Sequence, residues 1–234
     1  MISVVIPTLN ADARLGECLD ALVAPALDGV VKEVIVVDGG SADATLPMAD
    51  SFGTRILTAP PGRGGQLRRG AEAARGEWLL FLHADTVLEE GWAEEVLQFI
   101  KTHPDKAAVF TLQFDAKGLA PKLVAGGAML RTKFIKTPYG DQGLLISKAL
   151  YEDSGGYAEM PLMEDVEFIR RLTKRKGAQA LCVLKAQAVT SAERYERDGY
   201  VRRVMKNLTT LTRYFLGVAP EKLAQSYSRP VNRS

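Results

Sequence analysis

The sequence has 234 residues, of which 47% are hydrophobic and 25% are charged. This average composition excludes a disordered or fibrous chain and is typical of one sizeable globular fold with an extension. No apolar run approaches the roughly 20 residues needed to cross a bilayer, and no basic segment precedes the first apolar run, so we expect a cytoplasmic protein. The net charge of +2, without a dense basic patch, argues against nucleic acid as a partner.

Strand and helix patterns alternate through the first part of the chain. In chain order they are a strand at 2–6, a helix at 12–24, a strand at 32–38, a helix from Ser41, a strand at 55–58, a Pro/Gly loop at 59–65, a helix up to Arg75 and a strand at 77–85. This alternation predicts an α/β fold in which a mostly parallel sheet is covered by helices on both faces.

The alternation becomes irregular in the second part. In chain order we predict a helix at 92–101, a strand at 107–114, an irregular region at 117–136, a strand at 144–147, a helix at 163–176 closed by Gly177, and a strand pair within 178–191. The sheet is therefore expected to contain mixed strands toward the C-terminal half. We predict a main domain over 1–190 and a helical extension with a loose tail over 191–234.

The segment 200–215 has apolar residues at helical spacing with basic residues between them. Such a stripe most often packs on its own domain. Two alternatives are peripheral contact with an anionic membrane, where the segment would present a lipid-linked acceptor, and self-association. The sequence favours no particular oligomeric state. The last 15 residues have the pattern of a loose tail.

Polar residues follow the predicted strands, at the edge where open parallel sheets bind ligands. They form four groups: Pro7-Thr8-Leu9-Asn10, Asp38-Gly39-Gly40-Ser41, His83-Ala84-Asp85 and Gly140-Asp141-Gln142. Taken singly, Asp38 is also explained by an Asx-turn and Ser41 by a helix cap. Carboxylates gathered at one edge repel one another unless a cation or donor groups compensate them.

Three further features suit a phosphate-bearing ligand. Asp85 can bind a hard divalent metal that shares its coordination with phosphate oxygens, although it can also cap the following segment. The segment APPGRGGQLRRG brings backbone freedom and cations to a helix N-terminus, but its spacing matches neither a dinucleotide fingerprint nor a P-loop. Glu164 and Asp165 begin a helix, which the helix dipole alone would favour, or one of them acts as a general base.

These motifs together resemble the inverting family 2 glycosyltransferases of the GT-A fold, in particular the small soluble members described as radical-SAM/selenodomain-associated transferases. ISVVIPTLN is similar to the first strand and nucleotide-contacting turn of the family, VVDGGSADAT to its VVDDGSxDxT segment, and FLHADT to the strand with the DxD-type metal site. YGDQG and MEDVEF resemble the acceptor-side turn and the ED motif.

The resemblance implies roles for individual residues. Asp165 would be the catalytic base, Asp85 the ligand of a divalent metal (Mg²⁺ or Mn²⁺), and Asp38 the residue that holds the nucleobase. The residues implied in donor and acceptor binding are Pro7, Thr8, Leu9, Asn10, Asp38, Gly39, Arg63, Gly65, Gln66, His83, Ala84, Asp141, Gln142 and Glu164. His83 departs from the family, because it stands where the first Asp of the DxD motif is usual. The Q-x-x-R-W element of processive synthases has no counterpart, which favours transfer of a single sugar.

The expected reaction is inverting transfer of one sugar from a nucleotide-diphosphate sugar to an acceptor hydroxyl of unknown identity. The chelated diphosphate leaves without a proton, in contrast to the protonated leaving group of a glycosidase. Two alternatives stay open: a sugar-phosphate nucleotidyltransferase, and a non-catalytic protein that binds a nucleotide sugar.

Overall fold

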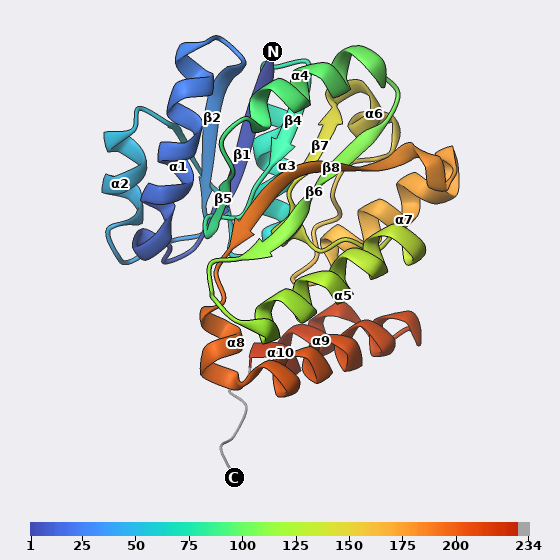
Figure 1. Ribbon diagram of the computed structural model, residues 1–234. Helices are drawn as coiled ribbons and strands as arrows, with labels where there is room; N and C mark the ends of the chain where they lie inside the picture. The colour runs from blue at the N-terminus through green and yellow to red at the C-terminus, as the bar shows by residue number, and fades with distance from the viewer. Residues whose placement is uncertain (229–234) are drawn as a thin grey trace.

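The computed structural model describes residues 1–228 and has an eight-stranded sheet between two sets of helices (Figure 1). The strands are β1 (Ile2–Thr8), β2 (Val31–Asp38), β3 (Arg55–Thr58), β4 (Trp78–Phe81), β5 (Thr86–Leu88), β6 (Ala107–Phe114), β7 (Leu144–Ser147) and β8 (Leu181–Thr190). Their order across the sheet is β3-β2-β1-β4-β7-β6-β8-β5. The pairs within β3-β2-β1-β4 are parallel, and β7 joins antiparallel on the other side of β4. The predicted mostly parallel α/β sheet with mixed strands in the second half is confirmed.

The helices begin and end close to most of the predicted positions. They are α1 (Asp12–Leu27), α2 (Thr45–Ser51), α3 (Arg63–Ala73), α4 (Trp92–Thr102), α5 (Leu119–Ile135), α6 (Lys148–Asp153), α7 (Glu164–Lys176), α8 (Glu193–Asp198), α9 (Tyr200–Phe215) and α10 (Pro220–Ser228). Two short 3₁₀ turns, Gly140–Gln142 and Ala178–Ala180, precede β7 and β8.

Alternate residues of the central strands pack in two hydrophobic cores, one on each face of the sheet. Val4 and Ile6 of β1 join the core that includes Leu15 and Leu22 of α1, whereas Val5 joins the core with Leu67 of α3. All seven residues of β1 are buried. A strand covered by helices on both faces has no polar side to expose, which explains the continuous apolar run in the sequence.

Helix α3 begins in close contact with the chain that precedes α7. A Cβ on Gly64 would overlap the backbone carbonyl oxygen of Ala158, whereas a Cβ on Gly65 would meet its nearest atom, Cγ of Glu159, at 4.0 Å. Only glycine therefore fits at position 64.

The two glycines allow a paired test. Gly64→Ala is expected to lower the free energy of unfolding by about 1–3 kcal/mol, because backbone atoms must move apart. Gly65→Ala is expected to be neutral or stabilising by up to about 1 kcal/mol, since alanine is the better helix former. Urea denaturation of the two variants measures the difference, and equal stability of both would contradict the close contact.

Four sequence predictions are wrong. The region 117–136 is not irregular, because α5 occupies most of it. The predicted strand pair within 178–191 is one strand, β8, whose register with β6 shifts near Val109. The second helix begins at Thr45 and not at Ser41, whose backbone and hydroxyl are bound to Asp38 instead.

The fourth wrong prediction is the loose tail. Residues 220–228 form α10, and Leu223 of this helix is fully buried. The rest of the predicted tail, 229–234, lies outside the described residues. Leu223 packs in a small cluster with Leu162 and Met163 before α7 and with Leu211 of α9. The cluster attaches the C-terminal helices to the main fold.

Strand β5 returns the chain to the far edge of the sheet directly after β4. It pairs antiparallel with the end of β8, with Thr86 opposite Thr190. The hydroxyl of Thr86 donates a hydrogen bond to that of Thr190 at 3.2 Å. The segment between β4 and β5, which contains His83 and Asp85, is thus fixed at both ends.

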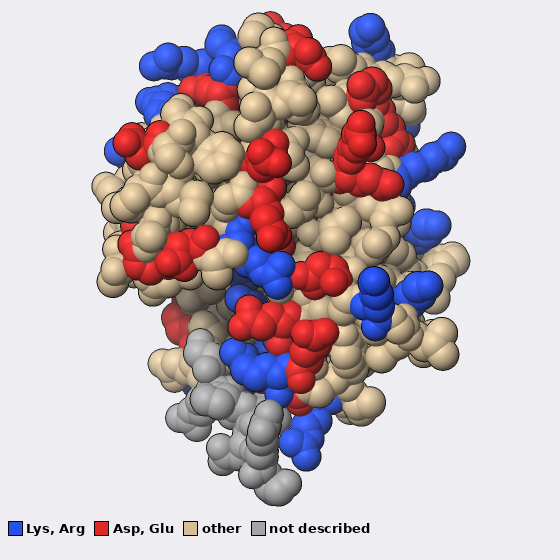
Figure 2. Space-filling model, turned by 60° about the vertical axis from the view of Figure 1, so that its left-hand side comes forward, with Lys and Arg blue, Asp and Glu red and all other residues tan. Residues whose placement is uncertain are grey.

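Acidic and basic side chains are mixed on one face of the molecule. On the face shown in Figure 2, Asp and Glu side chains are interleaved with Lys and Arg. Among the described residues of this face, no continuous basic surface of the kind used to bind nucleic acid is visible.

Candidate active site

The carboxyl ends of the parallel strands bring the predicted donor-binding turns together. β1 lies between β2 and β4, and its register places Thr8 beside Asp38. In the turn after β1, the side chain of Asn10 accepts a hydrogen bond from the backbone N–H of Ala42, and the backbone N–H of Asn10 donates to the Ser41 hydroxyl. The turns after β1 and β2 therefore support each other.

Asp38 organises the turn after β2. Its buried carboxylate accepts hydrogen bonds from the Thr8 hydroxyl at 3.1 Å, from the N–H groups of Gly40 and Ser41 at 2.8 Å, and from the Ser41 hydroxyl at 2.5 Å. Burial opposes ionisation, but these donors, led by Ser41, outweigh it and hold the pKa of Asp38 below its ordinary value. The group is therefore an ionised centre of the turn at neutral pH.

Gln66 of α3 holds the same turns through hydrogen bonds to their backbone. Its Nε2 donates to the backbone carbonyls of Thr8 and Val37, both at 2.8 Å. Gly39 lies against this amide, since a Cβ there would be 3.2 Å from Nε2 of Gln66. In this structure Gln66 is a positioning residue for the ends of β1 and β2.

Arg63, the first residue of α3, connects two other predicted site residues. Its Nη1 donates to Nε2 of His83 at 3.1 Å, and its Nε lies 3.3 Å from Oε1 of Glu164. Because a guanidinium only donates, Nε2 of His83 accepts and the ring proton is on Nδ1. Burial, followed by the charges of Arg63 and Arg194, holds the pKa of His83 well below its ordinary value. His83 is therefore a neutral side chain.

Glu164 is enclosed at the start of α7. Only 1% of the residue is exposed, and its Oε2 has no hydrogen-bond partner in the described part of the chain. Burial raises the pKa of Glu164, an effect that Arg63 opposes and Asp165 increases. The contact with Glu164 in turn fixes the direction of the Arg63 side chain.

A cavity of about 100 Å³ lies beyond the strand ends. Asp85, Asp141 and Asp165 place three carboxylates on its wall, and Arg63 and His83 line it as well. The sequence predicted all five of these residues for the site. The structure thus brings the DxD-like segment, the acceptor-side turn and the ED motif to one cavity.

Asp165 is held in a fixed orientation at the first turn of α7. Its Oδ2 accepts a hydrogen bond from the N–H of Gly140 at 2.6 Å, and its Oδ1 accepts from the N–H of Val166 at 2.7 Å. Each oxygen keeps a further lone pair for another donor. The protein therefore orients the carboxylate in the cavity wall and leaves it able to accept further hydrogen bonds.

The pKa of Asp141 is strongly affected by its surroundings. Burial raises its pKa to about 6, with Arg131 opposing the effect and Asp165 and Asp85 adding to it. Its Oδ1 is buried and has no hydrogen-bond partner among the described residues. The negative charges of two other carboxylates act on this buried, unpaired acceptor, so a cation bound beside it would be stabilised.

These groups fit a divalent metal only when further ligands join them. Within residues 1–228, no three His, Cys, Asp or Glu side chains are close enough together to hold a metal ion unaided. One or two carboxylates plus phosphate oxygens and water are, however, the usual ligands of Mg²⁺. Asp85, with the unpaired Oδ1 of Asp141 on the same cavity wall, fits a metal that arrives with a phosphate-bearing ligand.

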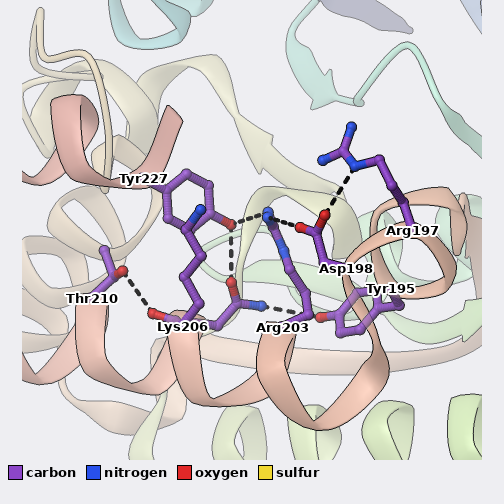
Figure 3. Close-up of polar contacts among 8 residues, drawn as sticks. Tyr195, Arg197, Asp198, Arg203, Lys206, Thr210 and Tyr227 are labelled. Atoms are coloured by element: carbon purple, nitrogen blue, oxygen red, sulfur yellow. Dashed lines mark hydrogen bonds and ion pairs between the residues drawn. The ribbon is translucent and has the colours of Figure 1, made fainter. Parts of the chain in front are cut away.

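The C-terminal helices complete the wall with residues that the sequence analysis missed. Figure 3 shows the polar network that joins them. Arg203 of α9 pairs with Asp198 at 3.2 Å and donates to the hydroxyl of Tyr227 at 2.6 Å. The Tyr227 hydroxyl donates to Asn207, whose amide donates to the hydroxyl of Tyr195. The network fixes α8, α9 and α10 to one another beside the cavity.

The other predicted residues lie elsewhere at the strand ends or inside the protein. Leu9 is exposed, whereas Pro7 and Ala84 are buried. Gln142 is fully buried, where its amide donates to the carbonyl of Phe110 and accepts from the hydroxyl of Thr132. It is not among the residues that line the cavity, and its predicted contact with substrate remains a prediction.

Comparisons with known proteins agree with the sequence motifs. Residues 3–138 match the profile of the family described as glycosyl transferase family 2. A PGL/p-HBAD biosynthesis glycosyltransferase of Mycobacterium tuberculosis is 37% identical over 118 residues, which are 47% of this chain and 45% of that protein. A glucosyl-3-phosphoglycerate synthase of the same species is 35% identical over 95 residues, 37% of this chain and 29% of the relative. The matched region thus spans less than half of either curated relative.

Solved structures have the same fold. S. aureus TarS 1-349 superposes with a TM-score of 0.65 at 20% identity, covering 80% of this chain and 60% of that one. The M. tuberculosis glucosyl-3-phosphoglycerate synthase, solved in complex with Mn²⁺, uridine diphosphate and phosphoglyceric acid, superposes with a TM-score of 0.63 at 21% identity, covering 89% and 77%. With a family profile that matches more than half of its residues, the chain belongs to glycosyl transferase family 2.

Proposed function

We propose that this protein transfers a single sugar, with inversion, from a nucleotide-diphosphate sugar to an acceptor hydroxyl. The observation that carries the proposal is the cavity in which Asp165 and Asp85, from two separate motifs, line the same wall beyond the strand ends. Asp165 is the base for the acceptor and Asp85 the ligand on the diphosphate side. The alternatives differ from it in their products: a nucleotidyltransferase releases pyrophosphate, and a protein that only binds a nucleotide sugar releases no product.

The donor is proposed to lie over the turns that follow β1 and β2. Asp38 and its hydrogen-bonded turn would face the nucleobase, while Arg63 at the start of α3 would approach the diphosphate. The solved relative in complex with uridine diphosphate makes UDP-sugars the first donors to test. When bound, a divalent metal held by Asp85, and by Asp141 as a second ligand, would neutralise the charge of the diphosphate.

Asp165 is proposed to remove the proton of the acceptor hydroxyl as that oxygen attacks the anomeric carbon. The bond between this carbon and the diphosphate oxygen breaks in the same step, and the proton remains on Asp165. The N–H groups of Gly140 and Val166 keep the carboxylate oriented throughout. This geometry supplies positioning as well as proton transfer, both of which lower the barrier.

The acceptor would enter beside the C-terminal helices. Arg194, Tyr195 and Asn207 line this part of the cavity and offer a cation and hydrogen-bonding groups. A lipid-linked hydroxyl is one candidate acceptor, and the protein would then act in the cytoplasm at the inner face of a membrane.

The decisive experiment measures nucleoside-diphosphate release from a panel of UDP-, GDP- and dTDP-sugars, with CMP-sialic acid as a monophosphate control. Each donor is tested with Mg²⁺, with Mn²⁺ and with EDTA. Metal-dependent release of a nucleoside diphosphate from one donor is expected. Release of pyrophosphate from a sugar phosphate and a nucleoside triphosphate would instead favour the nucleotidyltransferase, and donor binding without turnover of any tested acceptor would favour the binding protein.

A further inference from the structure

Helix α5 presents a row of large apolar side chains to solvent. Leu119, Leu123, Leu130 and Phe134 are 80%, 74%, 58% and 80% exposed. Their spacing of four, seven and four residues places them on one side of the helix. The opposite side is already packed, with Thr132 buried and Met129 in the cluster around Phe114. The exposed row is therefore an additional apolar surface and not the core-facing side.

Helix α9 has a second row of the same kind. Val201, Met205, Leu208 and Phe215 are 77%, 56%, 47% and 44% exposed, whereas Leu211 on the inner side is buried. α5 and α9 are in contact and lie side by side (Figure 1). Together with Ile135 and Leu216, these rows hold ten of the sixteen large hydrophobic side chains that are exposed in residues 1–228. We call the outward sides of these two helices the α5–α9 face.

The charge of the α5–α9 face has one sign. Neither helix contains an Asp or Glu. Lys122 and Lys133 on α5 and Arg202 on α9 are exposed near the apolar rows. This composition differs from the face in Figure 2, where acidic and basic side chains are interleaved. Apolar rows bordered by cations are the pattern of a surface that lies on an anionic bilayer.

We propose that the α5–α9 face docks on the surface of an anionic phospholipid bilayer. The apolar rows enter the boundary between headgroups and acyl chains, and Lys122, Lys133 and Arg202 contact the lipid phosphates. A second copy of the chain fits less well, because self-pairing of this face would oppose like charges across a low-dielectric contact. None of the described helices is long and apolar enough to span the bilayer, so the contact is peripheral.

Docking would place the catalytic cavity beside the lipid. Arg203 and Asn207 line the cavity from α9, the helix whose outer side carries the second apolar row. The bilayer would therefore lie about one helix diameter, roughly 10 Å, from the cavity wall. This consequence for the acceptor rests on the proposed function, whereas docking itself does not require sugar transfer.

Vesicle co-sedimentation of the full chain tests the proposal without measuring activity. Vesicles of equimolar phosphatidylglycerol and phosphatidylcholine are compared with vesicles of phosphatidylcholine alone. Stronger binding to the anionic vesicles is expected, weakened but not abolished by salt. The variant L123S/F134S is expected to lower the partition coefficient about tenfold or more, because two exposed apolar anchors are removed.

A matched variant controls for general loss of hydrophobic surface. V23S/L27S removes two exposed apolar residues one turn apart on α1, outside the α5–α9 face, and is expected to bind as wild type. Wild type that fails to bind anionic vesicles would overturn the proposal, as would equal losses in both variants. Sedimentation velocity gives the other overturning result: a dimer that L123S/F134S converts to monomer, without vesicle binding, would assign the face to a second copy.

Discussion

Asp165→Asn is expected to lower kcat for sugar transfer by about 10²- to 10⁴-fold, the range that a general base contributes. The donor Kd is expected to stay within about threefold of wild type, because the proposed role of Asp165 is confined to the transition state. Stopped assays of nucleoside-diphosphate release give kcat, and calorimetric titration with donor gives Kd. Loss of both together would mean that the donor site itself had been damaged.

The substitution also changes how the side chain is held by the backbone. Gly140 and Val166 each donate one N–H to it, so asparagine can accept from one of them and must turn its NH₂ group toward the other. Melting temperature is therefore measured for each variant. Glu167→Gln is the matched control, since Glu167 belongs to the same helical turn but pairs with Arg171 and does not line the cavity. Wild-type kcat in Asp165→Asn would remove it as the base.

Asp85→Ala is expected to have the second largest effect, through donor binding. Loss of outer-shell partners of a metal costs about 10- to 100-fold in affinity, and a direct ligand should cost at least as much. We expect the Mn²⁺-dependent gain in affinity for a nucleotide sugar to fall by about 100-fold or more in the variant. The donor Kd of wild type in EDTA should approach that of the variant in metal.

The control for Asp85→Ala is an exposed carboxylate on the same segment. Glu89 follows β5 and is exposed, so Glu89→Ala changes the net charge equally without touching the cavity. It is expected to keep the full metal response. Asp85→Ala that retains this response would show that the metal binds without Asp85.

The first half of the fold could be predicted because its signals are local. A strand buried on both faces reads as a short apolar run, as in residues 2–6, and the turns that follow contain Gly or Pro. The same locality explains why Asp85 and Asp165 could be chosen as candidates, since each belongs to a compact motif at the end of a strand or the start of a helix. Both line the cavity, and their roles stay predictions.

In the second half of the fold, some elements lack a local sequence pattern or depend on contacts between residues that are far apart in the chain. Helix α5 is apolar on its outer side as well as its inner side, so the amphipathic period that marks a helix is missing. Nothing in the sequence pairs Tyr227 with Arg203, yet its hydroxyl accepts a hydrogen bond from this residue, which is 24 positions away. The cavity wall made by the C-terminal helices therefore emerges only in three dimensions.

Strand β5 ties the segment that carries Asp85 to the chain that carries the C-terminal helices. Thr86 pairs with Thr190, and the residues directly after Thr190 lead into α8 with Arg194. If a ligand shifted α8 together with the pair of Thr86 and Thr190, the segment of Asp85 would move as well. Binding at the two ends of the cavity would then be thermodynamically linked, and reciprocity requires that each ligand change the affinity of the other by the same factor.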